Sequence, residues 1–184
     1  MSNIGNKKIL VINASPRHHG NSESLADAFI KGAKENSNTV YKFNLAQMNI
    51  RPCLGCNGYK RGRGTPCVLK DDMQQIYDLW SEADVVVFAS PVYWMQFTSY
   101  FFIFRDRLYA TVGEKIKEKE TVLLLAATSP AKNIYHMPEE YYEYMVNTLG
   151  WKDRGRIVAG GVKDPGEVLS TPFINEAYEL GRAI

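Results

Sequence analysis

The stretch VVVFASPVYWMQFTS, residues 85–99, joins a short apolar run to a polar and aromatic loop. The run, Val85–Ala89, is rich in β-branched residues and too short for a buried helix, so it predicts a strand that is covered on both faces. Strands of this kind are typical of parallel sheets with helices on both sides. The loop that follows therefore begins at the carboxyl end of a strand, where open α/β sheets bind their ligands.

The same pattern recurs along the chain, at Ile9–Ile12, Val122–Ala127 and Ile157–Ala159, and a weaker run at Thr39–Phe43 predicts an edge strand. Amphipathic helical stripes lie between these runs: Leu25, Phe29 and Ala33; Met73, Ile76, Tyr77 and Trp80; Phe101, Phe104 and Leu108; and the segments 141–149 and 174–180. The alternation predicts an α/β fold, a doubly wound five-stranded parallel sheet with helices on both faces. We find no linker or repeat, so residues 1–184 are expected to form a single domain.

The composition excludes several classes of protein. Of the 184 residues, 45% are hydrophobic and 23% charged, and the net charge of +2 is too small to indicate a nucleic-acid partner. The longest apolar run, Val122–Ala127, is far shorter than the ~20 residues that cross a bilayer, and Ile9–Ile12 is too short for a signal peptide. We therefore expect no membrane partner and a cytoplasmic location.

A polar loop, NASPRHHGNSES at residues 13–24, follows the first predicted strand. It lacks the glycine patterns that bind dinucleotides or nucleoside triphosphates. Its hydroxyl and amide side chains, together with the N–H groups at a helix start, suit a single phosphate dianion, and Arg17 could add a charged contact. An ordinary helix cap would use the same residue types, so both readings stay open here.

The loop after Val85–Ala89 carries Tyr93, Trp94 and Phe97, which offer flat apolar surfaces to a planar ligand. The same aromatic residues could instead fill the core or an interface. A phosphate-binding loop after one strand and an aromatic wall after another together favour flavin mononucleotide (FMN).

Several blocks of the sequence, in their order and spacing, point to a known family. They are SPR with GNSES, PCLGC followed by CVLKDDM, ADVVVFASPVYW, and FRDRL. With them the chain resembles the flavodoxin-like NAD(P)H-dependent FMN reductases, and among these the iron–sulfur flavoprotein branch. The resemblance implies a flavodoxin-like fold, non-covalent FMN and hydride transfer through the flavin.

The resemblance also assigns site residues by position. Those that would hold the FMN phosphate are Ser15, Arg17, Asn21 and Ser22. Those that would wrap the ribityl chain and the ring are Pro91, Val92, Tyr93 and Trp94, with Thr128 and Ser129 flanking the ring. No catalytic side chain is expected, because the flavin itself accepts and delivers the electrons.

The predicted function is an FMN-dependent oxidoreductase that takes a hydride from NADH or NADPH and passes electrons to a small acceptor such as a quinone or a flavin. Two alternatives stay open. A flavodoxin-type electron carrier is one, although carriers are usually strongly acidic. A redox sensor built on the cysteine loop is the other.

All three cysteines lie in residues 53–67, as Cys53, Cys56 and Cys67, and Tyr59 stands where a further cysteine would continue the C-x-x-C spacing. Three thiolates are one fewer than an iron–sulfur cluster normally uses, and no histidine lies nearby in sequence to complete a zinc site. We therefore predict no cluster and no metal, with the loop acting as a lid beside the flavin. Free redox-active thiols and small buried cysteines remain equally open readings.

Five consecutive apolar residues, Tyr100–Phe104, would place apolar side chains on every side of a helix. One sheet face cannot cover them all, so we expect a homodimer with this helix at or near the interface. Tyr141, Tyr142 and Tyr144 are candidates for the same surface. The alternative is an unusually aromatic monomer core.

Overall fold

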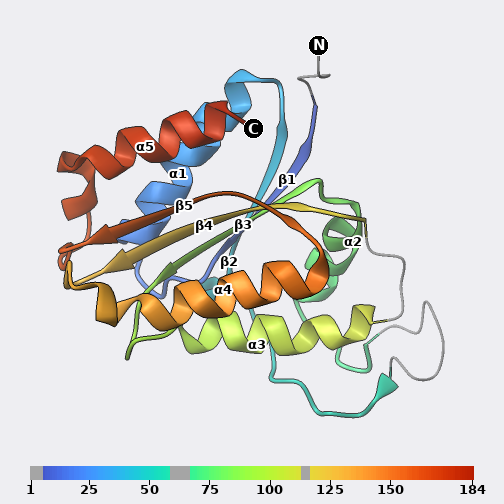
Figure 1. The fold of residues 1–184 in the computed structure, drawn as a ribbon. Helices are drawn as coiled ribbons and strands as arrows, with labels where there is room; N and C mark the ends of the chain where they lie inside the picture. Colours follow the sequence, from blue (N-terminus) through green and yellow to red (C-terminus); the bar gives the residue numbers. More distant parts are fainter. Residues whose placement is uncertain (1–5, 59–66, 113–116) are drawn as a thin grey trace.

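The computed structural model describes residues 6–58, 67–112 and 117–184, and its centre is one five-stranded sheet (Figure 1). The strands are β1 (Lys8–Asn13), β2 (Thr39–Asn44), β3 (Val85–Pro91), β4 (Glu120–Ala127) and β5 (Lys152–Gly160). All neighbouring strands run parallel, in the order β2-β1-β3-β4-β5. The predicted sheet is confirmed, including the position of residues 39–43 at an edge.

Helices cover both faces of the sheet (Figure 1). The helices α1 (Asn21–Glu35) and α5 (Pro172–Arg182) pack on one face, and α2 (Gln74–Glu82), α3 (Ser99–Arg107) and α4 (His136–Leu149) on the other. Short 3₁₀ turns complete the connections: η1 (Leu45–Gln47), η3 (Leu108–Thr111), η4 (Lys132–Ile134) and η5 (Glu167–Ser170). In the described parts of the chain, no helix combines the length and the apolar character that a membrane span requires.

The alternation of side chains along β1 shows how the two cores are divided. Ile9 and Val11 lie in the core beneath α1 and α5, whereas Leu10 and Ile12 lie in the core beneath α2, α3 and α4. All four are fully buried. A strand buried on both faces must be apolar at every position, which is why the continuous runs predicted the central strands.

Aromatic side chains of α3 and α4 fill much of the second core. Phe97 stacks on Phe101 with ring centroids 4.2 Å apart, and Phe102 and Tyr141 meet edge to face. Tyr142 is fully buried, and its hydroxyl bonds to Thr121 and Asp153. The expectation that Tyr142 lies at an interface is therefore wrong, because its polar group has partners within the monomer core.

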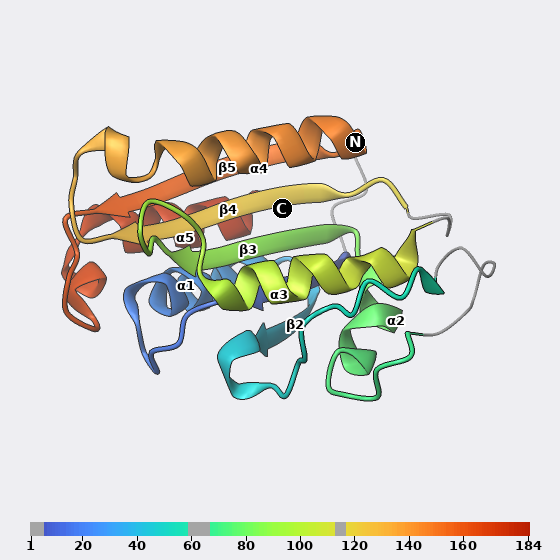
Figure 2. The ribbon, with the colours of Figure 1, turned by 90° about the horizontal axis from the view of Figure 1, so that it is seen from below.

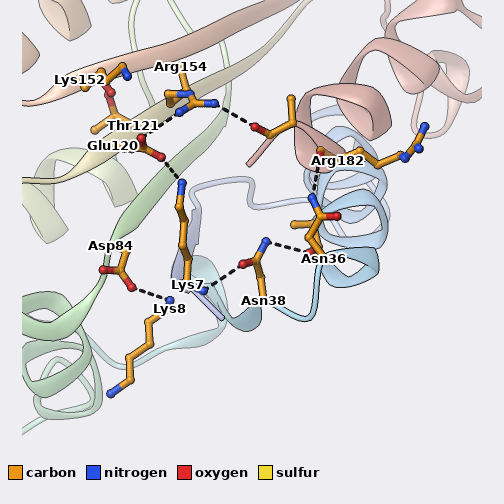
Figure 3. A network of polar contacts seen from close by, with 12 residues as sticks. Lys7, Lys8, Asn36, Asn38, Asp84, Glu120, Thr121, Lys152, Arg154 and Arg182 are labelled. Carbon is orange, nitrogen blue, oxygen red and sulfur yellow. Dashed lines mark hydrogen bonds and ion pairs between the residues drawn. The ribbon is translucent and has the colours of Figure 1, made fainter. Parts of the chain in front are cut away.

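The amino-terminal edge of the sheet is tied together by charged and polar side chains (Figure 3). Glu120 accepts from Lys7 Nζ at 2.7 Å and from Arg154 Nη1 at 2.9 Å. Burial raises the pKa of Glu120, but the two cations outweigh that effect and hold the pKa below its ordinary value. Asp84 accepts the backbone N–H of Lys8 at 2.8 Å, which links the starts of β1 and β3.

Helices α1 and α5 approach so closely that their contact requires glycine on both sides. A Cβ at Gly32 would lie 2.0 Å from the carbonyl oxygen of Tyr178, and one at Gly181 would lie 2.1 Å from that of Phe29. These obstacles are backbone atoms, which cannot rotate away. The position of α5 over the sheet therefore depends on these two glycines.

We expect Gly32→Ala to lower the free energy of unfolding by about 3 kcal/mol, the upper end of the usual range for overpacking, since the helices must separate to admit the methyl group. Urea denaturation followed by circular dichroism measures this. Lys34→Ala, at an exposed position of the same helix, serves as control and should stay within about 0.5 kcal/mol of the wild type. A Gly32→Ala variant as stable as that control would contradict the described packing.

Candidate functional site

The loops after β1 and β3 meet at the carboxyl edge of the sheet. The N–H of Ala14 donates to the carbonyl of Ala89 at 2.8 Å, and the hydroxyl of Thr98 donates to the carbonyl of Ala14 at 2.8 Å. The end of β4 lies beside them, because Val92 N–H donates to the carbonyl of Ala126. The sequence-predicted site residues at positions 15–22, 91–94 and 128–129 are thus brought to one edge.

The loop after β1 forms a tight turn that ends at the start of α1. The hydroxyl of Ser15 donates to the carbonyl of Arg17 and accepts the N–H of Arg17, each at 3.2 Å. Ser22, in the first turn of α1, is 1% exposed, and its hydroxyl has no hydrogen-bond partner among the described residues. A buried hydroxyl without a partner at the positive end of a 15-residue helix suits an anion.

Asn21 lies at the start of α1, and its side chain contacts the loop after β5. Its amide nitrogen donates to the carbonyl of Asp164 at 3.0 Å, and its amide oxygen accepts the N–H of Val168 at 3.2 Å. Arg17 reaches the same segment, donating to the carbonyl of Lys163 at 3.1 Å. In this structure both side chains hold the loop after β5 against α1, and the side-chain amide of Asn21 makes one donated and one accepted hydrogen bond to that loop.

Glu23 is a buried carboxylate beside this loop that the sequence analysis did not identify. It accepts the N–H of His19 at 2.7 Å, the ammonium of Lys42 at 2.8 Å and the amide of Asn44 at 3.2 Å. Burial raises the pKa of Glu23, but these donors outweigh it and lower the pKa below the ordinary value. Glu23 therefore fixes the His19 backbone and joins α1 to β2.

The aromatic loop after β3 is folded into a tight turn. Tyr93 and Gln96 exchange two backbone hydrogen bonds, of 2.9 and 3.0 Å, around Trp94 and Met95. Trp94 and Met95 have φ of 50° and 58°. This is a left-handed backbone conformation, which residues other than glycine adopt at a cost of about 1–2 kcal/mol each. Strain of this kind is typical of ligand-binding loops.

The predicted aromatic wall divides into two parts. Trp94 is 91% exposed and Tyr93 is 42% exposed, so both present their rings to solvent at the carboxyl edge. Phe97 is buried in the core against Phe101. Pro91, the last residue of β3, and Val92, which follows it, are half-buried.

Thr128 and Ser129 follow β4 as predicted. Thr128 is exposed, and the half-buried Ser129 accepts the N–H of Ala131 at its hydroxyl, at 3.2 Å. The next loop packs tightly behind them, since a Cβ at Gly160 would lie 2.8 Å from Pro130 Cα. This packing fixes the position of the loop after β4 at the carboxyl edge of the sheet.

The cysteine loop lies at the other end of α3. Thr98, which precedes α3, contacts the loop after β1, whereas the pocket beside Cys53 and Cys56 is lined by Arg107, in the last turn of α3. Figure 2 shows the segment before residue 59 beside that far end of α3. The expected lid beside the flavin is therefore wrong for the described part of the monomer, because α3 separates the two regions.

Cys67 contacts a buried ion pair. Arg107, 1% exposed, donates to Asp71 at 2.6 and 3.0 Å and to Cys67 Sγ at 3.4 Å. In the described ranges no three His, Cys, Asp or Glu side chains lie together as a metal site, and Tyr59 lies outside those ranges. With a guanidinium against one of three thiols, the side chains present do not fit an iron–sulfur cluster. Its predicted absence stays a prediction.

Sequence signals existed for some of the residues that were missed. Arg107 follows Phe104 by three positions on the stripe that buries Phe101, so its burial could have been predicted. The loop at 163–168 had no such signal, because its contacts to Asn21 span more than 140 positions of the chain.

Comparison with known proteins identifies the family. The family model described as NADPH-dependent FMN reductase matches residues 7–153, and the chain belongs to this family. It is an FMN-dependent NAD(P)H oxidoreductase. The predicted family, flavodoxin-like fold, enzyme class, FMN and nicotinamide co-substrate are confirmed.

Curated relatives lie in the predicted branch. An iron-sulfur flavoprotein from Archaeoglobus fulgidus is 36% identical over 182 residues, which cover 96% of this chain and 78% of the relative. An iron-sulfur flavoprotein from Clostridioides difficile is 30% identical over 118 residues, and the match spans 62% of this chain and 51% of the relative.

Solved structures share the fold at lower identity. An NAD(P)H:quinone oxidoreductase from Methanothermobacter marburgensis superposes with a TM-score of 0.79 at 20% identity, covering 97% of this chain and 96% of the other. An FMN-dependent NADH-azoreductase from Bacillus anthracis, solved in complex with FMN, gives a TM-score of 0.69 at 20% identity, with 96% and 98% covered. At this identity the likeness shows the fold alone.

If the unpartnered Ser22 hydroxyl and Ser15 bind the FMN phosphate, replacing both with alanine removes two hydrogen bonds to a charged group. Each is worth about 1.5–3 kcal/mol, so the Kd for FMN should rise by at least about a hundredfold. Titration of the FMN-free protein by calorimetry measures this. Ser24→Ala, in the same turn of α1, is the control and should bind like the wild type; equal affinity in the double variant would sink the phosphate assignment.

Proposed function

We propose that the chain is a single FMN-binding domain that takes a hydride from NADH or NADPH and passes electrons to a small planar acceptor such as a quinone or a flavin. The observation that carries this proposal is the strained turn at Tyr93–Gln96, which holds Trp94 in solvent at the same edge as the unpartnered Ser22 hydroxyl. A phosphate-binding loop and an exposed ring surface are what a flavin that reacts with a second planar molecule requires. We also propose that the protein carries out this reaction as a soluble enzyme in the cytoplasm.

Two groups of residues would hold the cofactor. Ser15, Ser22 and the first-turn N–H groups of α1 bind the phosphate, and Arg17 and Asn21 hold the loop at 163–168 against them. Pro91, Val92, Tyr93 and Trp94 cover the ring, with Thr128 and Ser129 on its other side. Since the loops after β1, β3 and β4 are linked by backbone hydrogen bonds, these contacts are positioned before the cofactor binds.

When bound, FMN supplies a flavin that accepts a hydride from a reduced nicotinamide and delivers electrons to an acceptor. The side chains bind and orient, and none of them is required to move a proton. The half-buried Pro91 and Val92 exclude water from the inner side of the ring site, while Tyr93 and Trp94 offer apolar faces to the molecule that approaches from solvent. We therefore assign no catalytic residue.

Two structural neighbours, a quinone oxidoreductase and an azoreductase, support the acceptor class. The exposed ring of Trp94 offers a stacking surface of the kind such molecules use.

We also propose a homodimer. Tyr100, at the start of α3, is 36% exposed, and Tyr144 on α4 is 71% exposed. Phe102 and Ile103 are only partly covered within the monomer. These side chains leave apolar area at the surface of α3 and α4 that a second copy would cover.

Anaerobic stopped-flow spectroscopy of the FMN-loaded protein tests the oxidoreductase directly. We expect NADH or NADPH to bleach the flavin absorbance in a single turnover, and a soluble quinone to restore it. If neither NADH nor NADPH reduces the flavin but a reduced protein partner does, the result would favour an electron carrier instead.

Trp94→Ala, assayed with FMN at saturating concentration, should lower kcat/KM for the quinone by at least about fivefold, because a stacking contact of about 1 kcal/mol or more is lost. Tyr41→Ala, at an exposed aromatic residue on the edge strand β2, is the control. If both variants have the same kcat/KM for the quinone as the wild type, Trp94 is not part of the acceptor site.

Sedimentation velocity at micromolar concentration tests the homodimer, for which a mass of twice 20.8 kDa is expected. Replacing Ile103 with Lys should shift the equilibrium to the monomer, because a charge would be buried in the interface. A wild-type protein that sediments as a monomer contradicts this part of the proposal.

A further inference from the structure

A cavity of about 510 Å³ lies at the carboxyl end of α3, away from the proposed flavin site. All three cysteines line it, together with Arg107 and Tyr109 among others. Cys53 and Cys56 are exposed, and Cys67 is half-buried. We call this cavity the thiol pocket; its volume is that of a small-molecule site.

Cys67 has the surroundings of a reactive thiol. Arg107 Nη2 donates to its Sγ at 3.4 Å. Burial raises the pKa of Cys67, but the N–H of Leu69, the Tyr77 hydroxyl and the Arg107 cation outweigh burial and lower the pKa below its ordinary value. Thiolates held in this way react with disulfides at neutral pH.

The ion pair beneath Cys67 is rigidly held. Arg107 donates to both carboxylate oxygens of Asp71 and to the carbonyl of Arg51 at 2.9 Å, and Tyr77 donates to the carbonyl of Arg107 at 3.0 Å. The Nε of Arg107 has no acceptor among the described residues, although the side chain is 1% exposed and lines the pocket. The pocket is therefore lined by a fixed cation that contacts the Cys67 thiol.

We propose that the thiol pocket is a second redox site, which exchanges electrons with small-molecule disulfides. The Cys67 thiolate attacks one sulfur of the disulfide R–S–S–R, forming a mixed disulfide and releasing the thiolate R–S⁻. Cys56 or Cys53, as a thiolate, then attacks the Cys67 sulfur, forming an intramolecular disulfide and releasing the second R–S⁻. The protein dithiol loses two electrons and the small disulfide gains them; the thiolates that leave take protons from the resolving thiol and from water.

The roles of the three cysteines follow from their exposure. Cys67 is the one that contacts the cation, so it is the attacking thiol, and the two exposed cysteines can reach a sulfur presented in the pocket. The charged and titratable groups around Cys67 are Arg51, Asp71, Tyr77, Asp106, Arg107 and Tyr109.

Single-cysteine variants of the full-length, FMN-loaded protein test the proposal. Cys53→Ser/Cys56→Ser retains Cys67, and Cys56→Ser/Cys67→Ser retains Cys53 as the matched control. Each is reduced, mixed with glutathione disulfide at pH 7 without oxygen, and quenched with acid before intact-mass analysis. We expect the folded Cys67-only variant to form its glutathione adduct at least about threefold faster than the Cys53-only variant. It should also react at least about threefold faster than the Cys67-only variant unfolded in urea. The reason is that the larger fraction of thiolate outweighs the lower nucleophilicity of a thiolate with a lowered pKa.

Two further measurements keep the test independent of the proposed flavin reaction. Tyr77→Phe added to the Cys67-only variant should slow adduct formation at least about twofold, with the circular dichroism spectrum and FMN content unchanged. In the wild type, peptide mapping should find the adduct replaced by a disulfide from Cys67 to Cys56 or Cys53. A Cys67 rate no higher than that of Cys53, a mixed disulfide that persists in the wild type, or stoichiometric iron with acid-labile sulfide in protein purified without oxygen would each overturn the proposal.

Discussion

The buried hydrogen bond from the Thr98 hydroxyl to the Ala14 carbonyl is the contact on which the proposed flavin site depends. It joins the loop after β1 to the loop after β3, at the point in the strand order where the chain changes direction across the sheet. Breaking it would leave a buried carbonyl unsatisfied, at a cost of about 1–3 kcal/mol. This contact helps to hold the proposed phosphate-binding turn and the strained aromatic turn side by side, as one shared ligand would require.

The fold was predictable because its central strands are buried on both faces. Val85–Ala89 and Val122–Ala127 must be apolar at every position, and no other short element requires that. The site was predictable only to the level of its loops. Asn21 and Tyr142 have polar groups whose partners, Asp164 and Asp153, come from separate elements, and nothing in the local sequence predicts which contact a buried amide or phenol will make.

Helix α3 separates two kinds of chemistry. Its start, next to Thr98, lies at the proposed flavin edge, and its last turn, at Arg107, lines the thiol pocket. Nine helical residues span about 14 Å, beyond the range at which substitutions usually affect one another. Side chains on the faces of this one helix thus support the aromatic core, the proposed dimer surface and the Cys67 environment, which explains why its sequence is apolar on several sides.

Hydrogen exchange of the FMN-free and FMN-loaded protein, resolved by peptide mass spectrometry, tests the central claim most directly. The account predicts that FMN slows exchange in the segments 15–23, 91–97 and 128–131, at the carboxyl edge of the sheet, and leaves 53–58 and the end of α3 unchanged. Protection centred on the cysteine segment, with the loop after β1 unaffected, would contradict it.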